Sequence, residues 1–210
     1  MNSLDSKTFT IFHPVKKFYF TTDTLTFILM MLSILPVIFE LVILKRSGFS
    51  VLSALFFSAY FIIVLVSIVL QFMAKRRYEV LKGILGGEIT FHPDRITING
   101  DDFLLTDMRK LNIYTQDYLD MVAPSGRTAN GRKLYGTNNR AELYLNKGKT
   151  LICYFQRIDD NTAKVMADLY TGYYTSGKLH WLTLLDLLGI SKYEEIQRFK
   201  SKVATGVVTS

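Results

Sequence analysis

The side chains best suited to chemistry are basic residues on and beside a polar, glycine-bearing stretch, residues 123–139. These residues are Arg127, Arg132, Lys133 and Arg140, interleaved with Gly126, Gly131 and Gly136. Guanidinium and ammonium groups on a glycine-containing backbone can bind phosphate groups. The stretch therefore predicts a site for an anionic lipid headgroup or another phosphate ligand. The alternative is a solvated loop whose charges only aid solubility.

Nothing else in the sequence has the residue types and spacing of a reactive site. There is no glycine-rich phosphate loop before a helix, no G-x-S-x-G and no H-E-x-x-H. The three histidines lie far apart, and the lone Cys153 excludes an internal disulfide and a multi-cysteine metal site. We therefore predict a protein that is not an enzyme and that needs no cofactor or metal.

Two long apolar runs, Leu25–Leu44 and Val51–Met73, dominate the first third of the chain. Glu40 is the only charged residue in the first run, and the second has none. A helix of about 20 apolar residues crosses the hydrocarbon layer of a bilayer, and backbone in lipid must satisfy its own hydrogen bonds. The runs predict an antiparallel transmembrane hairpin with the lipid bilayer as its partner. The alternative, two buried core helices, is disfavoured because the rest of the chain is too polar to cover them.

Polar residues recur every seven positions along both runs. They are Thr26, Ser33 and Glu40 in the first run and Ser53, Tyr60 and Ser67 in the second, with Gln71 one turn further on. A seven-residue repeat fits two helices that cross at a shallow angle, and small hydroxyl side chains are common at such contacts. Two interpretations are open: a seam that joins the two helices, or a polar path in a homo-oligomer. Glu40 is expected to anchor the helix at the interface, near Lys45 and Arg46, one turn after a kink at Pro36.

The charge balance is mildly basic, with 25 Lys and Arg against 18 Asp and Glu and a formal net charge of +7. This interspersed excess suits a domain beside an anionic leaflet and is too weak to predict binding of a nucleic acid duplex. Basic residues are denser outside the two runs (Lys7, Lys16, Lys17, Lys75, Arg76, Arg77 and Lys82) than between them (Lys45 and Arg46). The positive-inside rule then predicts that both termini are cytoplasmic.

The remaining chain predicts a domain of short antiparallel strands followed by helices. Turn signals at His92-Pro-Asp and Asn99-Gly100 separate segments with period-two alternation, and the pattern becomes helical from Asp159 to Tyr174. A capping box at Ser191-x-x-Glu194 predicts a last amphipathic helix. We divide the chain into an interfacial segment (1–24), the hairpin (25–74), a β-rich cytoplasmic domain (75–176) and C-terminal helices with a tail (177–210). A short edge strand is the alternative for part of the first segment.

The segments Gly87–Gly100 and Leu105–Tyr114, with the pair Tyr173-Tyr174, resemble small bacterial membrane proteins of the YcxB-like type. The resemblance covers about Tyr78–Tyr174 together with the order of the hairpin. It implies a membrane α-helical hairpin plus an α+β soluble domain. That domain would be an antiparallel PH-like β-sandwich or barrel closed by C-terminal helices, at the bacterial inner membrane. The family has no assigned reaction, and His180–Val203 lies beyond its usual end.

Two functional hypotheses follow. The first is a non-enzymatic inner-membrane protein whose PH-like domain presents a binding or scaffold surface at the cytoplasmic face. The second is a two-span antiviral effector that disrupts the membrane when its β-rich domain binds a cyclic nucleotide through the basic loop. Only the architecture suggests the second hypothesis.

Overall fold

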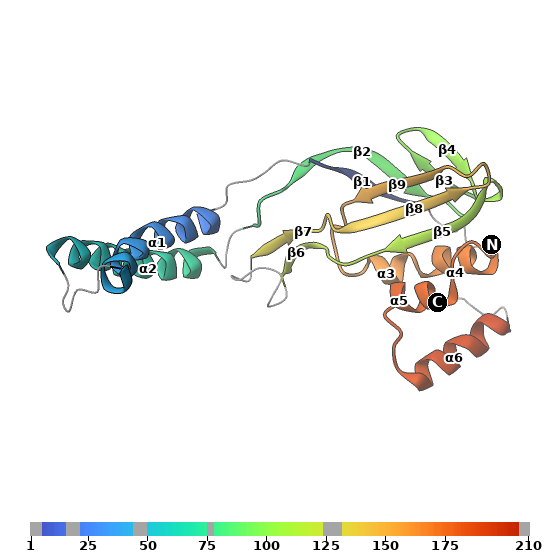
Figure 1. Ribbon diagram of the computed structural model, residues 1–210. Coiled ribbons are helices and arrows are strands. Elements are labelled where there is room, and N and C mark those ends of the chain that lie inside the picture. The colour runs from blue at the N-terminus through green and yellow to red at the C-terminus, as the bar shows by residue number, and fades with distance from the viewer. Residues whose placement is uncertain (1–5, 16–21, 44–49, 75–77, 124–131, 206–210) are drawn as a thin grey trace. The chain divides into compact units, whose positions relative to one another are not determined.

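The computed structural model describes residues 6–15, 22–43, 50–74, 78–123 and 132–205 (Figure 1). The chain divides into two compact units. The sheet unit comprises Met1–Val15, Gly83–Met121 and Leu134–Ser210, and the hairpin unit comprises Lys16–Lys82 and Val122–Lys133. Each unit is built around its own packing, so each is described by itself.

The hairpin unit contains the two apolar helices that the sequence predicts. Helix α1 spans Thr22–Ile38 and continues into a π-helical turn, η1, at Phe39–Ile43; helix α2 spans Val51–Ala74. Within them, Thr24–Val42 and Ser53–Leu70 are long and apolar enough to cross a membrane. Pro36 lies inside α1 and cannot donate to the helical ladder, and the widened turn η1 begins three residues later.

The sheet unit is built on one seven-stranded antiparallel sheet in the order β4-β3-β2-β1-β9-β8-β5. The strands are β1 (Lys7–Pro14), β2 (Gly83–Phe91), β3 (Arg95–Ile98), β4 (Asp101–Leu104), β5 (Met108–Tyr114), β8 (Asn139–Leu145) and β9 (Thr150–Phe155). A separate pair joins β6 (Leu119–Val122) and β7 (Lys133–Tyr135). The order has two ends, β4 and β5, so the sheet of the described residues is open. Of the predicted alternatives, sandwich or barrel, a closed barrel is not found in this part of the chain. The PH-like assignment stays a prediction.

Strand β1 corrects our interpretation of the first segment. We placed residues 1–24 at the membrane interface, with an edge strand as the alternative. The structure instead puts Lys7–Pro14 inside the sheet, between β2 and β9. Phe9 and Ile11 alternate with threonines and pack into the core. The correction covers Lys7–Pro14 alone. The other aromatic residues and lysines on which the interfacial prediction rests, residues 16–20, lie outside the described residues.

The hairpin unit is inserted where a β-turn would stand. Strands β1 and β2 are antiparallel neighbours, and Pro14 at the end of β1 is opposite Gly83 at the start of β2. A Cβ at Gly83 would overlap the Phe12 ring and the His13 carbonyl oxygen, so only glycine allows this close approach. Residues 15–82 therefore connect two strands that a tight turn would be long enough to join.

The predicted turns between the next strands are confirmed. The amide of His92 donates to the Arg95 carbonyl at 2.9 Å in the turn between β2 and β3. Asn99 and Gly100 have φ values of 52° and 90°, the left-handed conformation that a two-residue hairpin loop requires. The sequence predicted these turns correctly because their chemistry is local.

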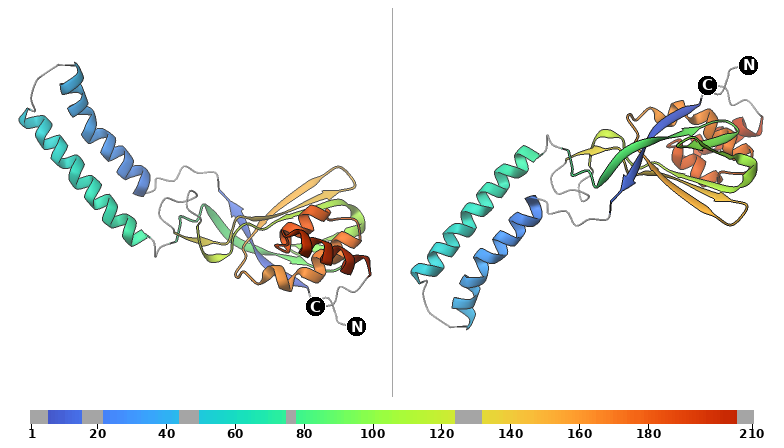
Figure 2. Two further views of the ribbon diagram at one scale, coloured as in Figure 1. Left: turned by 90° about the horizontal axis from the view of Figure 1, so that it is seen from below. Right: turned by 90° about the horizontal axis from the view of Figure 1, so that it is seen from above.

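Four helices follow the sheet: α3 (Thr162–Val165), α4 (Ala167–Thr175), α5 (Trp181–Leu187) and α6 (Tyr193–Ala204). Helices α3 to α5 lie on one face of the sheet, as two further views also show (Figures 1 and 2). Tyr170 and Tyr173 of α4 are buried against the core residues of the strands. The predicted helix up to Tyr174 is interrupted at Met166, which lies between α3 and α4.

The capping box predicted at Ser191 is wrong. Helix α6 begins at Tyr193, and its N-cap, Lys192, makes no side-chain capping bond. The preceding helix does have a side-chain cap, because His180 Nδ1 accepts a 3.3 Å hydrogen bond from the Leu182 amide. No residue of α6 is buried, and its Phe199 ring stacks on Trp181 at 5.8 Å between ring centroids.

Candidate functional site

The polar seam of the hairpin unit is buried while the apolar surface around it is exposed. Ser33, Glu40, Ser53 and Ser67 are 6%, 8%, 2% and 8% exposed. Thr26 and Tyr60 are half-buried, and the side chain of Gln71 lies outside the described residues. The helix pair thus places four of the predicted seam residues in its interior. Leucine, isoleucine, valine and phenylalanine side chains cover its exterior; Leu32, Leu35, Leu55, Phe61 and Leu65 are examples, each more than half exposed.

Glu40 accepts a hydrogen bond from Ser50, the residue just before the second helix. Ser50 Oγ donates a 2.8 Å hydrogen bond to Glu40 Oε2 and accepts one of 3.2 Å from the Ser53 amide. Ser53 Oγ donates to the Ser50 carbonyl at 3.0 Å. Ser50 is therefore both the cap of α2 and a partner of the carboxylate. Sequence reasoning missed Ser50, although a serine directly before an apolar helix is a capping signal. Lys45 and Arg46, the expected partners, lie outside the described residues.

The basic residues of the predicted phosphate site are distributed over both units. Arg127 lies outside the described residues. Arg132 and Lys133 belong to the hairpin unit, where Lys133 Nζ stands 5.8 Å from the centroid of the Tyr78 ring. Arg140 belongs to strand β8 of the sheet unit.

Arg140 is engaged by its own sheet. Its guanidinium lies 4.4 Å from the centroid of the Tyr114 ring, and its Nε is 3.0 Å from Glu142 Oε1. Glu142 Oε2 also accepts hydrogen bonds from Asn112 Nδ2 at 3.2 Å and from the Tyr144 hydroxyl at 2.9 Å. The hydrogen bond to Glu142 raises the pKa of Tyr144. Because Glu142 balances its charge, Arg140 is better suited to a structural network on this face than to binding a phosphate.

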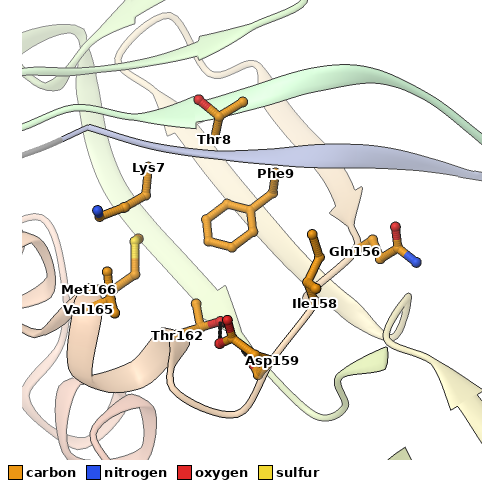
Figure 3. A pocket seen from close by; sticks show the side chains of 9 residues that line it. All are labelled: Lys7, Thr8, Phe9, Gln156, Ile158, Asp159, Thr162, Val165 and Met166. Atoms are coloured by element: carbon orange, nitrogen blue, oxygen red, sulfur yellow. Dashed lines mark hydrogen bonds between the residues drawn. The ribbon is translucent and has the colours of Figure 1, made fainter. Parts of the chain in front are cut away.

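A small pocket of about 180 Å³ lies between the start of β1 and helix α3 (Figure 3). Phe9, Ile158, Val165 and Met166 form its apolar walls. Its polar lining comes from Lys7, Thr8, Gln156, Asp159 and Thr162. Thr162 Oγ1 donates to Asp159 Oδ1 at 3.2 Å and to the Asp159 carbonyl at 3.1 Å, so this carboxylate is already engaged by the start of α3. The contact between Thr162 and Asp159 is local to the start of α3, three residues apart in the chain.

A larger groove of about 420 Å³ lies where strands β1 and β9 diverge. The two strands pair only at Ile11–Phe155 and Phe12–Tyr154, whereas β1 continues beside β2 to Pro14. The groove is lined by Ile11–Pro14 on one side and by Leu151–Tyr154 on the other. Cys153 is part of this lining, and burial raises the pKa of its thiol to about 11. Sequence reasoning missed this groove because it depends on how two distant strands separate.

A buried polar cluster near β8 has a structural role that the sequence did not reveal. Asn139 is fully buried; its Oδ1 accepts from the amides of Gln116 (2.9 Å) and Asp117 (3.3 Å). Its Nδ2 donates to the Gly136 carbonyl at 2.7 Å and to the Phe155 carbonyl at 3.3 Å. One side chain thus satisfies backbone groups from three segments, which fixes the chain around the start of β8.

The described residues contain no group of three or more His, Cys, Asp or Glu side chains arranged to hold a metal ion. Comparisons of the chain with family models, with curated proteins and with solved structures find no match. The resemblance to the YcxB-like type therefore stays a prediction from the sequence.

Proposed function

We propose that this protein is a non-enzymatic protein of the bacterial inner membrane. In this proposal the hairpin unit anchors it in lipid, and the sheet unit is a binding or scaffold domain at the cytoplasmic face. The main observation behind the proposal is that the helix pair buries polar residues and exposes apolar ones, the reverse of a soluble protein. Serines and Glu40 lie inside, and large apolar side chains lie outside.

The reversed polarity supports lipid rather than water as the solvent of the helices. Only 17% of the first span and 6% of the second are buried, whereas the core helix of a soluble protein is mostly buried. Burial of apolar surface contributes roughly 25 cal/mol per Å² in water, so two helices with this exterior would aggregate there. In hydrocarbon the same exterior is well solvated, and the polar groups are better placed between the helices.

The sheet constrains how the chain can cross a membrane. Strand β1 precedes the hairpin, β2 and β9 follow it, and all three are hydrogen-bonded neighbours. Strands of one sheet lie on the same side of a membrane, so the segment between β1 and β2 must cross it an even number of times. Two crossings satisfy this requirement. The basic residues outside the hairpin then favour the cytoplasm for both termini.

Membrane fractionation tests the anchor. We expect the full-length chain to sediment with membranes and to resist carbonate extraction, and a C-terminal alkaline-phosphatase fusion to be inactive. As the matched variant, residues 15–82 are replaced by Asn-Gly, which suits the tight turn between Pro14 and Gly83. This variant is expected in the soluble fraction. A full-length chain that is monomeric in water without detergent would overturn the proposal.

The binding role rests on the basic residues of residues 123–139 and on the PH-like resemblance. We expect the full-length protein in detergent to bind vesicles that contain phosphatidylglycerol, and the triple variant Arg127→Ala, Arg132→Ala, Lys133→Ala to bind them more weakly. The Arg140→Ala variant is the control, because Arg140 is paired with Glu142. Unchanged binding in the triple variant would remove the basic loop from the proposal. Among the described residues, no specific observation favours the cyclic-nucleotide effector.

A further inference from the structure

The groove between β1 and β9 has an apolar floor and two isolated charges. Ile11, Ile98, Phe103 and Leu151 line it and also belong to the core of the sheet unit or pack against it. The groove is thus an opening onto the hydrophobic core. Its volume of about 420 Å³ falls within the range of small-molecule pockets in proteins. A ligand with a long apolar body would cover core surface that the fold leaves open.

The charged residues of the lining are Lys149, in the turn before β9, and Asp101, at the start of β4. Both are exposed, and no ion pair involves either of them in the described part of the chain. A groove with one cation and one anion is complementary to a ligand whose polar head carries both a negative and a positive charge. A purely anionic head would pair with Lys149 and meet repulsion from Asp101.

The β1 side of the groove is close in sequence to the first apolar helix. Its β1 side ends at Pro14, and residues 15–21 connect Pro14 with the first residue of α1, Thr22. An extended chain spans at most about 3.6 Å per residue, which limits the distance between Pro14 and Thr22 to roughly 30 Å. If the helix is in lipid, as the proposed function holds, a lipid is a ligand that the groove would encounter. This step rests on the proposed function.

We propose that the groove between β1 and β9 binds a single acyl chain whose head carries a phosphate and an amine. The chain lies on Ile11, Ile98 and Phe103. Lys149 pairs with the phosphate, and Asp101 pairs with the amine. The ligand comes either from the bilayer, as a phosphatidylethanolamine, or from a free lysophosphatidylethanolamine.

Cys153 allows a direct test because it lines the groove and is the only cysteine of the chain. The full-length protein is placed in phosphatidylglycerol nanodiscs, and alkylation of the thiol by N-ethylmaleimide at pH 9 is followed by mass spectrometry. Added lysophosphatidylethanolamine is expected to slow alkylation at least tenfold. Glycerophosphoethanolamine, which has the head without the chain, is expected to leave the rate unchanged. Slow alkylation already in nanodiscs that contain phosphatidylethanolamine would identify the bilayer as the source.

Variants of the groove lining test separately how the acyl chain and the head of the lipid contribute to binding. Ile152 lines the groove and is 56% exposed, so Ile152→Glu charges the groove without disturbing the core and should abolish protection. The exposed Ile158, which is not part of this lining, provides the control Ile158→Glu. Lys149→Ala should weaken protection by lysophosphatidylethanolamine, whereas Lys147→Ala in the same turn should not. Asp101→Asn should remove the preference for lysophosphatidylethanolamine over lysophosphatidylglycerol.

Three results would overturn the proposal: no protection by any lipid, equal protection by the head alone, or full protection in Ile152→Glu. Equal protection by oleate and lysophosphatidylethanolamine would overturn the assignment of the head. Co-migration of the protein with the nanodiscs reports membrane anchoring independently of Cys153. A failure of the groove is therefore distinguishable from a failure of the proposed function.

Discussion

The hydroxyl of Tyr173, in helix α4, donates a 2.7 Å hydrogen bond to the backbone carbonyl of His92, in the turn between β2 and β3. Burial raises the pKa of Tyr173 well above its ordinary value, so the hydroxyl remains a donor across the physiological range. This bond joins the helical layer to a turn 81 residues earlier in the chain.

Removing that hydroxyl should loosen the contact between helix and sheet. We expect Tyr173→Phe to lower the free energy of unfolding by about 1–2 kcal/mol, because the ring still fills its site while the His92 carbonyl loses its partner. Chemical denaturation followed by circular dichroism measures the change. The matched control is Tyr174→Phe, since the neighbouring Tyr174 uses its ring to contact Trp181 at 5.3 Å. Equal losses in both variants would contradict the assigned role.

The buried amide of Asn139 should be one of the most sensitive polar positions of the sheet unit. Asn139→Ala removes a side chain that serves the amides of Gln116 and Asp117 and the carbonyls of Gly136 and Phe155. Each buried group left without a partner costs about 1–3 kcal/mol, so we expect a loss of about 3 kcal/mol or more. Thermal unfolding of the purified protein measures it. In the exposed control, Asn146→Ala, only one hydrogen bond, to Thr106, is lost, and the expected change is below about 1 kcal/mol.

The two faces of helix α2 should differ in their tolerance of the same substitution. Ser53 is buried at the seam, whereas Ser58, one to two turns later, is exposed. Ser53→Leu overpacks the helix pair, and overpacking costs about 1–3 kcal/mol. We expect it to lower the unfolding temperature of the full-length protein in detergent, whereas Ser58→Leu should leave it unchanged. If Ser58→Leu were the more harmful of the two, the inward-facing assignment of the seam would be wrong.

The Cys153 thiol should resist alkylation and make stability depend on alkaline pH. Burial raises its pKa from 9.0 to about 11, so at pH 8 its thiolate fraction, and its reaction with a disulfide reagent, should be about 100-fold lower than for a free thiol. The proton is bound more tightly in the folded state. Stability from this group is therefore fully present below pH 9 and is lost as pH rises toward 11. The difference in unfolding free energy between the natural chain and Cys153→Ala, measured from pH 8 to 11, should fall accordingly.

Local patterns predicted the local features of the fold. The Asn99-Gly100 loop and the two apolar helices were predicted correctly because both depend on residues that are adjacent in the sequence. The seven-residue repeat identified Ser33, Glu40, Ser53 and Ser67, which the structure buries. The break at Met166 and the start of α6 at Tyr193 were missed. Met166 is fully buried, so its packing in the core accompanies the break, whereas the structure gives no side-chain cap for α6.

Features that depend on distant partners were not predictable. Strand β1 is adjacent to β2 and β9. The sequence around Lys7–Pro14 does not determine which strands pair with it. The groove depends on where β1 and β9 separate, beyond Phe12 and Tyr154. Asn139 looked like one of several loop asparagines, because its partners at Gln116 and Phe155 come from other segments. A single sequence therefore does not predict which of these residues come into contact in the folded protein.

The position of β1 also sets the order of assembly during synthesis. This strand leaves the ribosome first, but its neighbour β9, which pairs Phe155 with Ile11, is made after most of the chain. The two apolar helices are synthesised in between, so they leave the ribosome while the first strand still has an unsatisfied edge. Any nascent chain that stalls before β9 would leave that edge open to other chains and to proteases. Completion of the sheet is thus a late step that follows the synthesis of both apolar helices.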